Sequence, residues 1–314
     1  MCFDMSERLS MIKIDGWLNL DKPLGLTSNQ AIGAVKRILA PKKIGHAGTL
    51  DPLATGILPL ALGEATKTVK FIQGARKGYS FTVRWGQATE TDDREGQVTE
   101  RSEHRPTQAE IKAALPEFTG TVSQTPPLYS AIKIKGERAY KIARRGDSAT
   151  IEARDIHIES FELIEIVDAD HARFKVICGK GTYIRALARD LAEFLGTKGH
   201  LAELRRTFVG PFNEKRSISL EKLKEMVHSL PREAIPIPLS DVLDDIPAVR
   251  LKGDEAERLR HGQTVRFISR QDIDRLPDLD GPTEAIAWHN KTPVAIVIRE
   301  GPEIKPERVF NLTR

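Results

Sequence analysis

Asp51 is a candidate catalytic carboxylate because it lies in a short loop rich in glycine and is followed by a proline. The loop reads Gly45-His46-Ala47-Gly48-Thr49-Leu50-Asp51-Pro52-Leu53-Ala54-Thr55-Gly56. Glycine lets a ligand approach the main chain closely, and a following proline keeps Asp51 out of the α region. A carboxylate held in this way can act as a nucleophile that forms a covalent intermediate. The same residue types also build ordinary turns, in which Asp51 would only cap the next turn.

Two further residues could act with a carboxylate. Arg185 stands near the start of a predicted helix, where the helix dipole slightly disfavours a cation, so a purely structural role is less expected there. Tyr79 begins an alternating run with Phe81, Val83 and Trp85, which predicts a half-buried strand. A tyrosine in such a strand is usually part of the core, so the pattern alone favours a structural role.

Five blocks of sequence, in a fixed order, resemble the tRNA pseudouridine synthase B (TruB) family. The loop quoted above resembles the catalytic loop of that family, and the other four blocks span most of residues 16–204. These four are Gly16-Trp17-Leu18-Asn19-Leu20-Asp21-Lys22-Pro23 with Gly25-Leu26-Thr27-Ser28, Leu62-Gly63-Glu64-Ala65-Thr66-Lys67, Gln124-Thr125-Pro126-Pro127-Leu128-Tyr129-Ser130-Ala131-Ile132-Lys133, and Gly179-Lys180-Gly181-Thr182-Tyr183-Ile184-Arg185.

The resemblance implies an isomerase that converts uridine to pseudouridine at position 55 in the T arm of tRNA. The bond between C1′ of the ribose and N1 of uracil breaks, and the base turns and is reattached through C5. An isomerisation needs no redox cofactor, metal or group donor, and the sequence contains no GxGxxG, GxxxxGK[ST] or HExxH motif. Two alternatives remain: a synthase that acts on other RNA, including guide-dependent relatives, and an RNA-binding or chaperone protein without catalysis.

The resemblance also implies roles for the three candidate catalytic residues. Asp51 would be the nucleophile, attacking C6 of the base or C1′ of the ribose, or it would stabilise a glycal-type intermediate. Arg185 would keep Asp51 ionised and position it through a two-pronged hydrogen bond. Tyr79 would stack on the uracil and supply a hydroxyl for proton transfer.

Substrate-binding residues follow from the same resemblance. The target base must be flipped out of the folded arm, and the ring of His46 would fill the space it leaves. Leu204 would form an apolar wall of the uracil pocket. Lys22 and Lys67 match positions near the site.

The segment around 126–155 resembles the insertion with which the family grips RNA. Its basic residues, interleaved with aromatic ones, suit phosphate contact and stacking, although a solvated helix face would have the same composition. We expect substrate contact from Tyr129, Lys133 and Arg144 in particular. The basic and aromatic residues are Tyr129, Lys133, Lys135, Arg138, Tyr140, Lys141, Arg144 and Arg145.

Start and stop signals predict the helices that support these residues. Thr107 and Glu110 form a capping box before a helix, and Ser219 precedes a helix that Pro231 ends. Thr182 is expected to cap a helix whose apolar stripe contains Ile184, Leu187, Leu191 and Leu195.

The predicted fold class is α+β, divided into three parts. After an N-terminal tail at 1–14, residues 15–240 should form the pseudouridine synthase fold, a mixed and mainly antiparallel sheet flanked by helices and loops. Four prolines between Pro231 and Pro247 suggest a linker. Short strand-like runs within 241–314 predict a small β-barrel that resembles the PUA-type RNA-binding domain, or a stabilising domain without RNA contact.

Composition limits the partners and the compartment. A net charge of +4 over 314 residues suits a local basic face but does not by itself indicate nucleic-acid binding. With only Cys2 and Cys178, no signal sequence and no membrane-spanning apolar run, we expect a cytoplasmic protein with no membrane contact and no structural zinc. With the resemblance, this predicts a monomer that acts on tRNA without an obligatory protein partner.

Overall fold

A nine-stranded sheet is the largest element of the computed structural model, which describes residues 11–130, 132–134, 136–145, 150–277 and 281–312. Its strands run in the order β1-β3-β12-β4-β11-β10-β7, with β2 paired to β3 and β13 paired to β12. All pairings are antiparallel except that between β12 and β3. The strands are β1 (Gly16–Lys22), β2 (Ile44–His46), β3 (Ala54–Leu62), β4 (Lys77–Trp85), β7 (Gly120–Gln124), β10 (Arg154–Ile166), β11 (His171–Cys178), β12 (Gly199–Val209) and β13 (Phe212–Asn213).

Strand β4 confirms the predicted alternation of apolar residues. Tyr79, Phe81, Val83 and Trp85 are all buried. Phe81 lies opposite Phe174 of β11, and the two rings stack with their centroids 5.5 Å apart. Such cross-strand aromatic pairs fix the register of a sheet.

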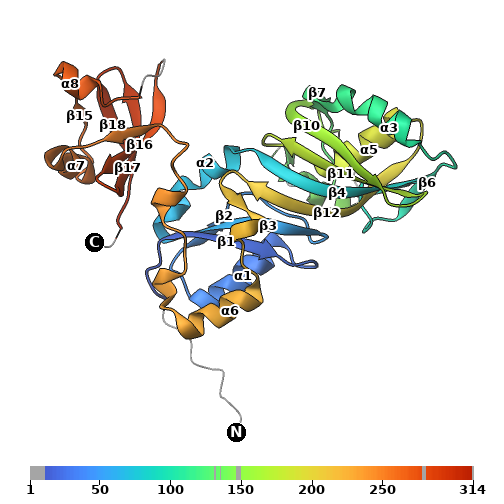
Figure 1. Cartoon of the computed structure of the whole chain (residues 1–314), viewed down its shortest axis with the longest axis horizontal. Coiled ribbons are helices and arrows are strands. Elements are labelled where there is room, and N and C mark those ends of the chain that lie inside the picture. The colour runs from blue at the N-terminus through green and yellow to red at the C-terminus, as the bar shows by residue number, and fades with distance from the viewer. Residues whose placement is uncertain (1–10, 131, 135, 146–149, 278–280, 313–314) are drawn as a thin grey trace, which may run out of the picture.

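Two groups of helices cover different ends of this sheet (Figure 1). Helices α1 and α6 lie together beside β1 and β3, whereas α3 and α5 lie near β10, β4 and β12. The helices are α1 (Ser28–Leu39), α2 (Val69–Gly74), α3 (Gln108–Ala114), α4 (Ala139–Arg144), α5 (Ile184–Phe194) and α6 (Leu220–Ser229), with 3-10 turns at Gly63–Thr68, Leu115–Phe118, Glu214–Arg216, Arg232–Ala234 and Leu239–Asp241. Two small hairpins, β5 (Gln87–Thr89) with β6 (Val98–Arg101) and β8 (Lys133–Ile134) with β9 (Glu137–Arg138), complete this part.

The capping predictions are confirmed for two helices and wrong for a third. Thr107 and Glu110 form the capping box of α3, and the side chain of Ser219 accepts a hydrogen bond at the start of α6. Helix α5 instead has Tyr183 at its N-cap position with no side-chain cap, because the Thr182 hydroxyl lies toward the carbonyl of Gly179. Ile184, Leu187 and Leu191 of the predicted apolar stripe are buried, whereas Leu195, at the C-cap position of α5, is only partly buried.

The proline-rich segment 231–247 packs against the sheet. Ile237 and Trp17 exchange two backbone hydrogen bonds, of 2.8 and 2.7 Å, so the segment extends the edge at β1. Leu239 and Leu243 are buried. The segment packs against the sheet because burying the apolar residues between its prolines stabilises the fold.

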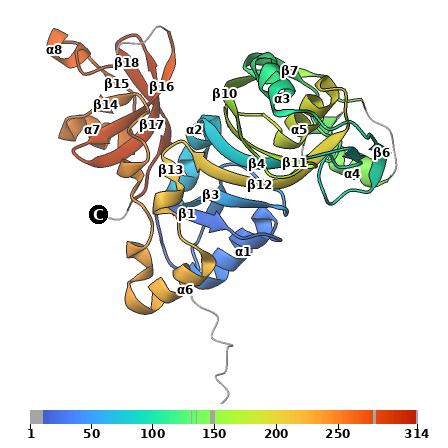
Figure 2. The same ribbon diagram turned by 45° about the vertical axis from the view of Figure 1, so that its right-hand side comes forward.

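The C-terminal part is a second sheet with the strand order β14-β16-β17-β18-β15. It is curled, and helix α7 packs against it, as Figure 2 shows from a second direction. The elements are β14 (Ala248–Arg250), α7 (Gly253–Arg260), β15 (Val265–Arg266), α8 (Arg270–Ile273), β16 (Thr283–His289), β17 (Thr292–Glu300) and β18 (Glu303–Val309). The predicted β-rich domain is thus present as a curled sheet, and its PUA-like identity stays a prediction.

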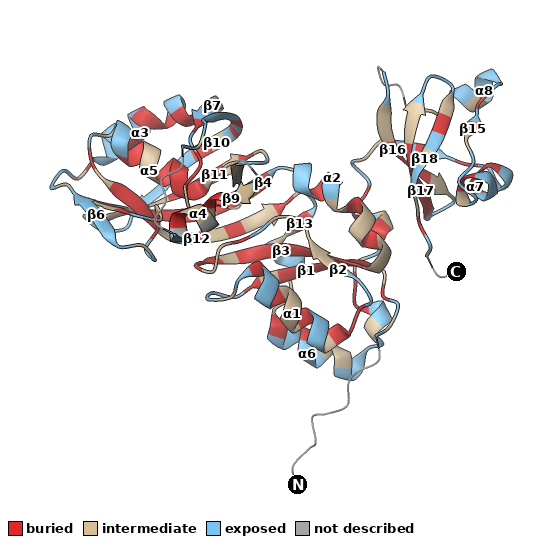
Figure 3. Ribbon diagram, turned by 180° about the vertical axis from the view of Figure 1, so that it is seen from behind, coloured by how far each residue is buried: buried red, intermediate tan, exposed pale blue. Residues whose placement is uncertain are grey.

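A shared apolar cluster joins the two sheets. Trp17 and Phe212 of the first part lie in one buried cluster with Ile286, Ile296 and Phe310 of the second. Figure 3 shows the buried residues of both parts in red. Among the described residues, no helix has both the length and the apolar character needed to cross a bilayer.

Candidate active site

The loop that carries Asp51 is fixed from both sides. Ser28, in the first turn of α1, donates its hydroxyl to the carbonyl of Leu50 at 3.0 Å and accepts from the Leu50 amide at 2.8 Å. On the other side of Asp51, the amide of Ala54 donates to the Asp51 carbonyl at 3.1 Å. Gly48 has a φ of +118°, a conformation that other residues rarely adopt. The loop therefore presents Asp51 from a well-defined backbone.

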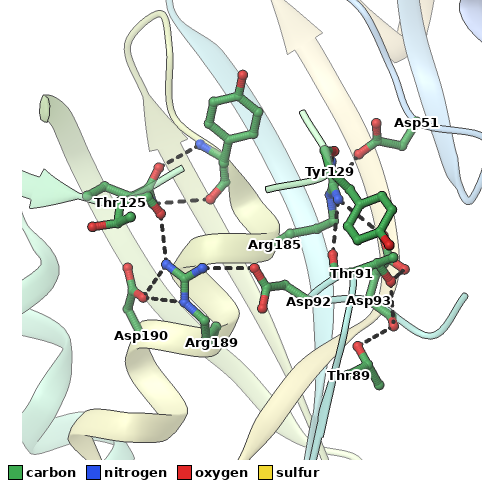
Figure 4. Close-up of polar contacts among 12 residues, drawn as sticks. Asp51, Thr89, Thr91, Asp92, Asp93, Thr125, Tyr129, Arg185, Arg189 and Asp190 are labelled. Carbon is green, nitrogen blue, oxygen red and sulfur yellow. Dashed lines mark hydrogen bonds and ion pairs between the residues drawn. The ribbon is translucent and has the colours of Figure 1, made fainter. Parts of the chain in front are cut away.

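Arg185 of α5 approaches Asp51, with 3.0 Å between its Nε and Asp51 Oδ2 (Figure 4). The terminal nitrogens of Arg185 donate to the carbonyls of Thr91 and Tyr129, each at 3.0 Å. The guanidinium therefore joins three segments of the chain. It contacts Asp51 through Nε only, so the expected two-pronged bond to Asp51 is not found.

The ion pair between Asp51 and Arg185 is unequally buried. Only 6% of the Arg185 side chain is exposed, compared with 37% of the Asp51 side chain. A second carboxylate, that of Asp93, lies 3.6 Å from Arg185 and is almost fully buried. The two carboxylates offset the cost of burying the guanidinium, and only Asp51 remains open to a ligand.

The turn at residues 89–95 was not predicted to belong to the site. Asp93 is held by the Thr91 hydroxyl at 2.5 Å and by the amide of Glu95 at 3.0 Å. The preceding residue, Asp92, has a φ of +58° and accepts from Arg189 at 2.8 Å. Arg189 stands one turn after Arg185 on α5, and this spacing of four was the available signal in the sequence.

Arg189 also ties the turn to the start of the expected insertion. Its Nη2 donates to the carbonyl of Thr125 at 2.8 Å, and its Nε donates to Asp190 at 2.8 Å. Figure 4 shows the two arginines side by side along α5 with these partners. Helix α5 thus holds the turn at 89–95 and the segment around 125–129 against the Asp51 loop.

Tyr79 and Leu204 line the same cleft as Asp51. They come from neighbouring strands β4 and β12, and both are less than 10% exposed. Burial raises the pKa of the Tyr79 hydroxyl, and the neighbouring Arg206 guanidinium opposes this shift only in part. The hydroxyl therefore keeps its proton at neutral pH.

The cleft has a volume of about 890 Å³ and combines polar and apolar walls. His46 and Tyr129 also line it, as does Lys77, which sequence reasoning did not single out. Lys77 donates to the carbonyls of Gln73 and Ala75, and its burial lowers its pKa to about 8. Among the described residues, no group of three or more His, Cys, Asp or Glu side chains is arranged to hold a metal ion.

Comparison with known proteins identifies the family. Residues 36–184 match the TruB family pseudouridylate synthase (N terminal domain), and residues 185–246 match the tRNA pseudouridylate synthase B C-terminal domain. A tRNA pseudouridine synthase B of Bradyrhizobium diazoefficiens is 47% identical over 96% of this chain and 87% of its own length. One of Caulobacter vibrioides is 46% identical over 98% of this chain and its full length. The chain belongs to the TruB family of pseudouridine synthases.

Solved structures agree with this assignment. A chain of a Cbf5-Nop10-Gar1 complex aligns with a TM-score of 0.73 and 26% identity, covering 94% of this chain and 84% of that one. A chain of an H/ACA RNP bound to a substrate RNA containing 2′-deoxyuridine has a TM-score of 0.72 at 24% identity, covering 95% of this chain and 85% of that one, and shares the fold. The predicted pseudouridine synthase fold is confirmed.

His46 is placed in this TruB-family chain at the end of β2, on the wall of the cleft. Its Nδ1 is buried without a hydrogen-bond partner in the described part of the chain. Burial lowers the pKa of the ring, and the nearby Arg206 lowers it further. His46 is therefore a neutral ring that lines the cleft.

The two predicted lysines do not line the cleft. Lys22 is fully buried, and its amine donates to the carbonyls of Pro23 and Leu26 at 2.9 and 2.7 Å. Burial lowers its pKa to about 8, and the Asp51 charge opposes the shift. Lys67 lies at the contact with the C-terminal part, where it donates to the carbonyl of Val309 at 2.6 Å. Both lysines were predicted because they match positions of the family near the site, and such a match does not fix where an amine points.

The expected RNA-gripping insertion contributes to the cleft through Tyr129, Arg138 and Tyr140. Arg145 instead pairs with Glu137 at 2.5 Å. The backbones of Lys133 and Arg144 lie in β8 and α4, but their side chains, and all of Lys135, fall outside the described residues.

Proposed function

We propose that this chain converts the uridine at position 55 in the T arm of tRNA to pseudouridine, with Asp51 as the nucleophile. The observation that carries the proposal is the position of the Asp51 carboxylate. It is open to a cleft of about 890 Å³ and lies 3.0 Å from a buried arginine. Membership of the TruB family and the names of the relatives support tRNA as the substrate.

Three groups at the cleft have a part in the proposed reaction. Asp51 forms a transient covalent bond to the substrate, which divides one difficult step into two. Arg185 places a positive charge 3.0 Å from the Asp51 carboxylate and fixes its direction. In the net reaction, the N1–C1′ bond breaks and a C5–C1′ bond forms, while the proton on C5 is lost and one is gained at N1. Tyr79, whose hydroxyl is protonated, is placed to take part in that exchange.

Base flipping accounts for the shape of the site. A stacked base cannot reach a carboxylate that lines a cleft, so the target nucleotide must leave the stack. Tyr79 provides a ring on which the base can stack, Leu204 provides an apolar wall, and the neutral ring of His46 can replace the missing base in the arm.

We further propose that the chain acts as a cytoplasmic monomer without a protein partner, with a catalytic domain at 15–240 and an RNA-binding PUA-like domain at 241–314. Basic residues of 126–155 would contact RNA phosphates. The single described cysteine, Cys178, is free and buried, as suits a reducing compartment.

The test is to incubate the purified chain with an unmodified tRNA transcript and no added cofactor. Pseudouridine should form at position 55, and a transcript with cytidine at that position should give none. Tight binding without product would indicate an RNA-binding protein, whereas product only in other RNA would indicate a different substrate. Size-exclusion chromatography of the active fraction tests the monomer.

A further inference from the structure

Arg206 occupies the point where the three central strands of the site meet. In β12 it is paired with Gly56 of β3 on one side and with Tyr79 of β4 on the other. Its side chain is 1% exposed and reaches the cleft. Neither the sequence motifs nor the reaction described above gave Arg206 a role.

The guanidinium of Arg206 binds the backbone of the Asp51 loop. Its Nη2 donates to the carbonyl of Gly48 at 3.1 Å, and its Nη1 lies 3.4 Å from the carbonyl of Thr49. Its Nε donates to the carbonyl of Ile57 at 2.7 Å, just beyond the loop. One side chain therefore holds the loop before and after Asp51.

No carboxylate among the described residues forms an ion pair with Arg206. The neighbouring Arg205 points to the opposite face of the sheet, where it pairs with Asp21 at 2.8 Å and Glu214 at 2.5 Å. A buried cation with only neutral carbonyls as acceptors is costly, so burial of Arg206 is not explained by charge pairing.

A glycine of β3 makes room for the backbone of Arg206. Gly56 has a φ of +100°, and a Cβ there would lie 2.2 Å from the carbonyl oxygen of Arg206. A Cβ on Gly48 would lie 3.4 Å from Arg206 Nη1. Glycine at position 56 is therefore needed for the close approach of the Arg206 backbone, whereas the distance at Gly48 is an ordinary van der Waals contact.

We propose that Arg206 is a positioning residue that holds Asp51 and Tyr79 in one fixed geometry. Arg206 lies directly opposite Tyr79 in the pairing of β12 with β4, and both side chains line the cleft. Since a guanidinium can only donate, a hydrogen bond between the two groups would use the Tyr79 oxygen as acceptor and leave the hydroxyl proton for the cleft. Arg206 thus sets both the place of the carboxylate and the direction in which the tyrosine donates.

The test compares Arg206→Gln and Arg206→Lys with Arg205→Gln as the matched control. It rests on the proposed function, so wild-type turnover on tRNA is established first. Both Arg206 variants should slow single-turnover pseudouridine formation by about 100-fold, because small misplacements of reacting groups have effects of this size. Affinity for tRNA should change less than about 3-fold, since Arg206 points at carbonyls and not at phosphate. Lysine should not rescue the rate, because it lacks the planar fork. Arg205→Gln should remain close to wild type.

A merely structural role would give a different pattern. In that case the Arg206 variants would lose turnover only in proportion to the fraction unfolded, which circular dichroism at the assay temperature measures. A double-mutant cycle of Arg206→Lys with Tyr79→Phe measures the coupling between the two residues in single-turnover rate. This readout can be obtained even if the variants are less stable. Strong non-additivity supports the proposal, and full additivity, or wild-type rates in folded Arg206 variants, overturns it. An inactive wild-type chain would instead contradict the proposed function.

Discussion

At the scale of single residues, the two opposite charges of the site, Arg185 and Asp51, differ in burial. Arg185 is buried and its terminal nitrogens donate to carbonyls, whereas Asp51 keeps more than a third of its side chain exposed. Because fixed dipoles and charges need no reorganisation during the reaction, an arginine held in place stabilises charge better than one that moves with the substrate. The arrangement suits a carboxylate that must stay ionised and yet react.

Tyr79→Phe tests the role of the hydroxyl. The ring would remain available for stacking, so affinity for tRNA should stay near wild type. The rate should fall by about 100-fold or more, because a positioned acid or base is lost. Tyr79→Leu should also weaken binding, since the stacking surface is removed. Single-turnover kinetics with both variants decides the matter, and a phenylalanine variant that turns over like wild type would leave Tyr79 as a platform only.

Lys77 should give the protein a measurable pH dependence of stability. Its pKa is about 8 when folded, against 10.5 for an unperturbed lysine. Between these values the unfolded chain binds more protons, so the free energy of unfolding should rise with pH, by at most about 1.4 kcal/mol per pH unit. Lys77→Met lacks this contribution, so from pH 7 to 9.5 the free energy of unfolding of wild type should increase relative to that of the variant. Urea unfolding at several pH values measures the difference, and parallel curves for the two proteins would contradict it.

At the scale of elements, neighbouring residues of a strand serve opposite faces of the sheet. In β12, Leu204 and Arg206 face the cleft, whereas Arg205 between them forms ion pairs on the other side. The two-residue period of a strand produces this division. It is also why the strand containing Tyr79 could be predicted from sequence, since Phe81, Val83 and Trp85 repeat with the same period.

The segment 126–155 should determine how RNA binding depends on salt. Changing Lys133, Lys135, Arg138 and Arg144 together to glutamine should raise the dissociation constant for tRNA. Because each neutralised phosphate releases counterions, the slope of log K against log salt should become shallower by about 0.7–0.9 for every phosphate that the variant no longer binds. Lys222→Gln with Lys224→Gln on α6, away from the cleft, is the matched control. An unchanged slope would mean that the segment is only a solvated face.

Contacts within turns were harder to predict than strands and helices. The Thr89 to Glu95 turn reads as solvent-exposed polar residues, and nothing local shows that Asp93 is buried against Arg185. The pairing of Asp51 with Arg185 was accessible only through the resemblance to a family. Strand β18 has little apolar pattern, because only Ile304 and Val309 of Glu303–Val309 pack into the core.

At the scale of the whole molecule, the two sheets are joined by apolar packing and by lysines of the first part. Lys70 pairs with Glu284 and Glu307, and Lys67 donates to Glu64 and to the carbonyl of Val309. The backbone of Asn311 in turn donates to Glu64 at 2.7 Å. The chain after β18 is thereby held against residues 63–70.

Lys67→Met should loosen this contact without affecting the chemical step. The variant loses hydrogen bonds to Val309 and Glu64, so proteases should cleave the C-terminal part a few-fold faster. The single-turnover rate should stay within about 3-fold of wild type, since each such bond contributes only about 1 kcal/mol and none lies in the cleft. Lys36→Met, at an exposed position of α1, serves as the control. A large loss of rate with unchanged protease resistance would place Lys67 in substrate binding after all.

The central claim is that the Asp51 carboxylate is the nucleophile, and Asp51→Asn tests it most directly. Asparagine keeps the shape and an oxygen that can face Arg185 but removes the negative charge. Glu203→Gln is the matched control, because Glu203 lies beside Leu204 but faces Thr82 on the other side of the sheet. Single-turnover assays on tRNA should show a loss on the order of 1,000-fold or more for Asp51→Asn, with affinity for tRNA nearly unchanged. Pseudouridine formed at the wild-type rate by a folded Asp51→Asn protein would contradict the account.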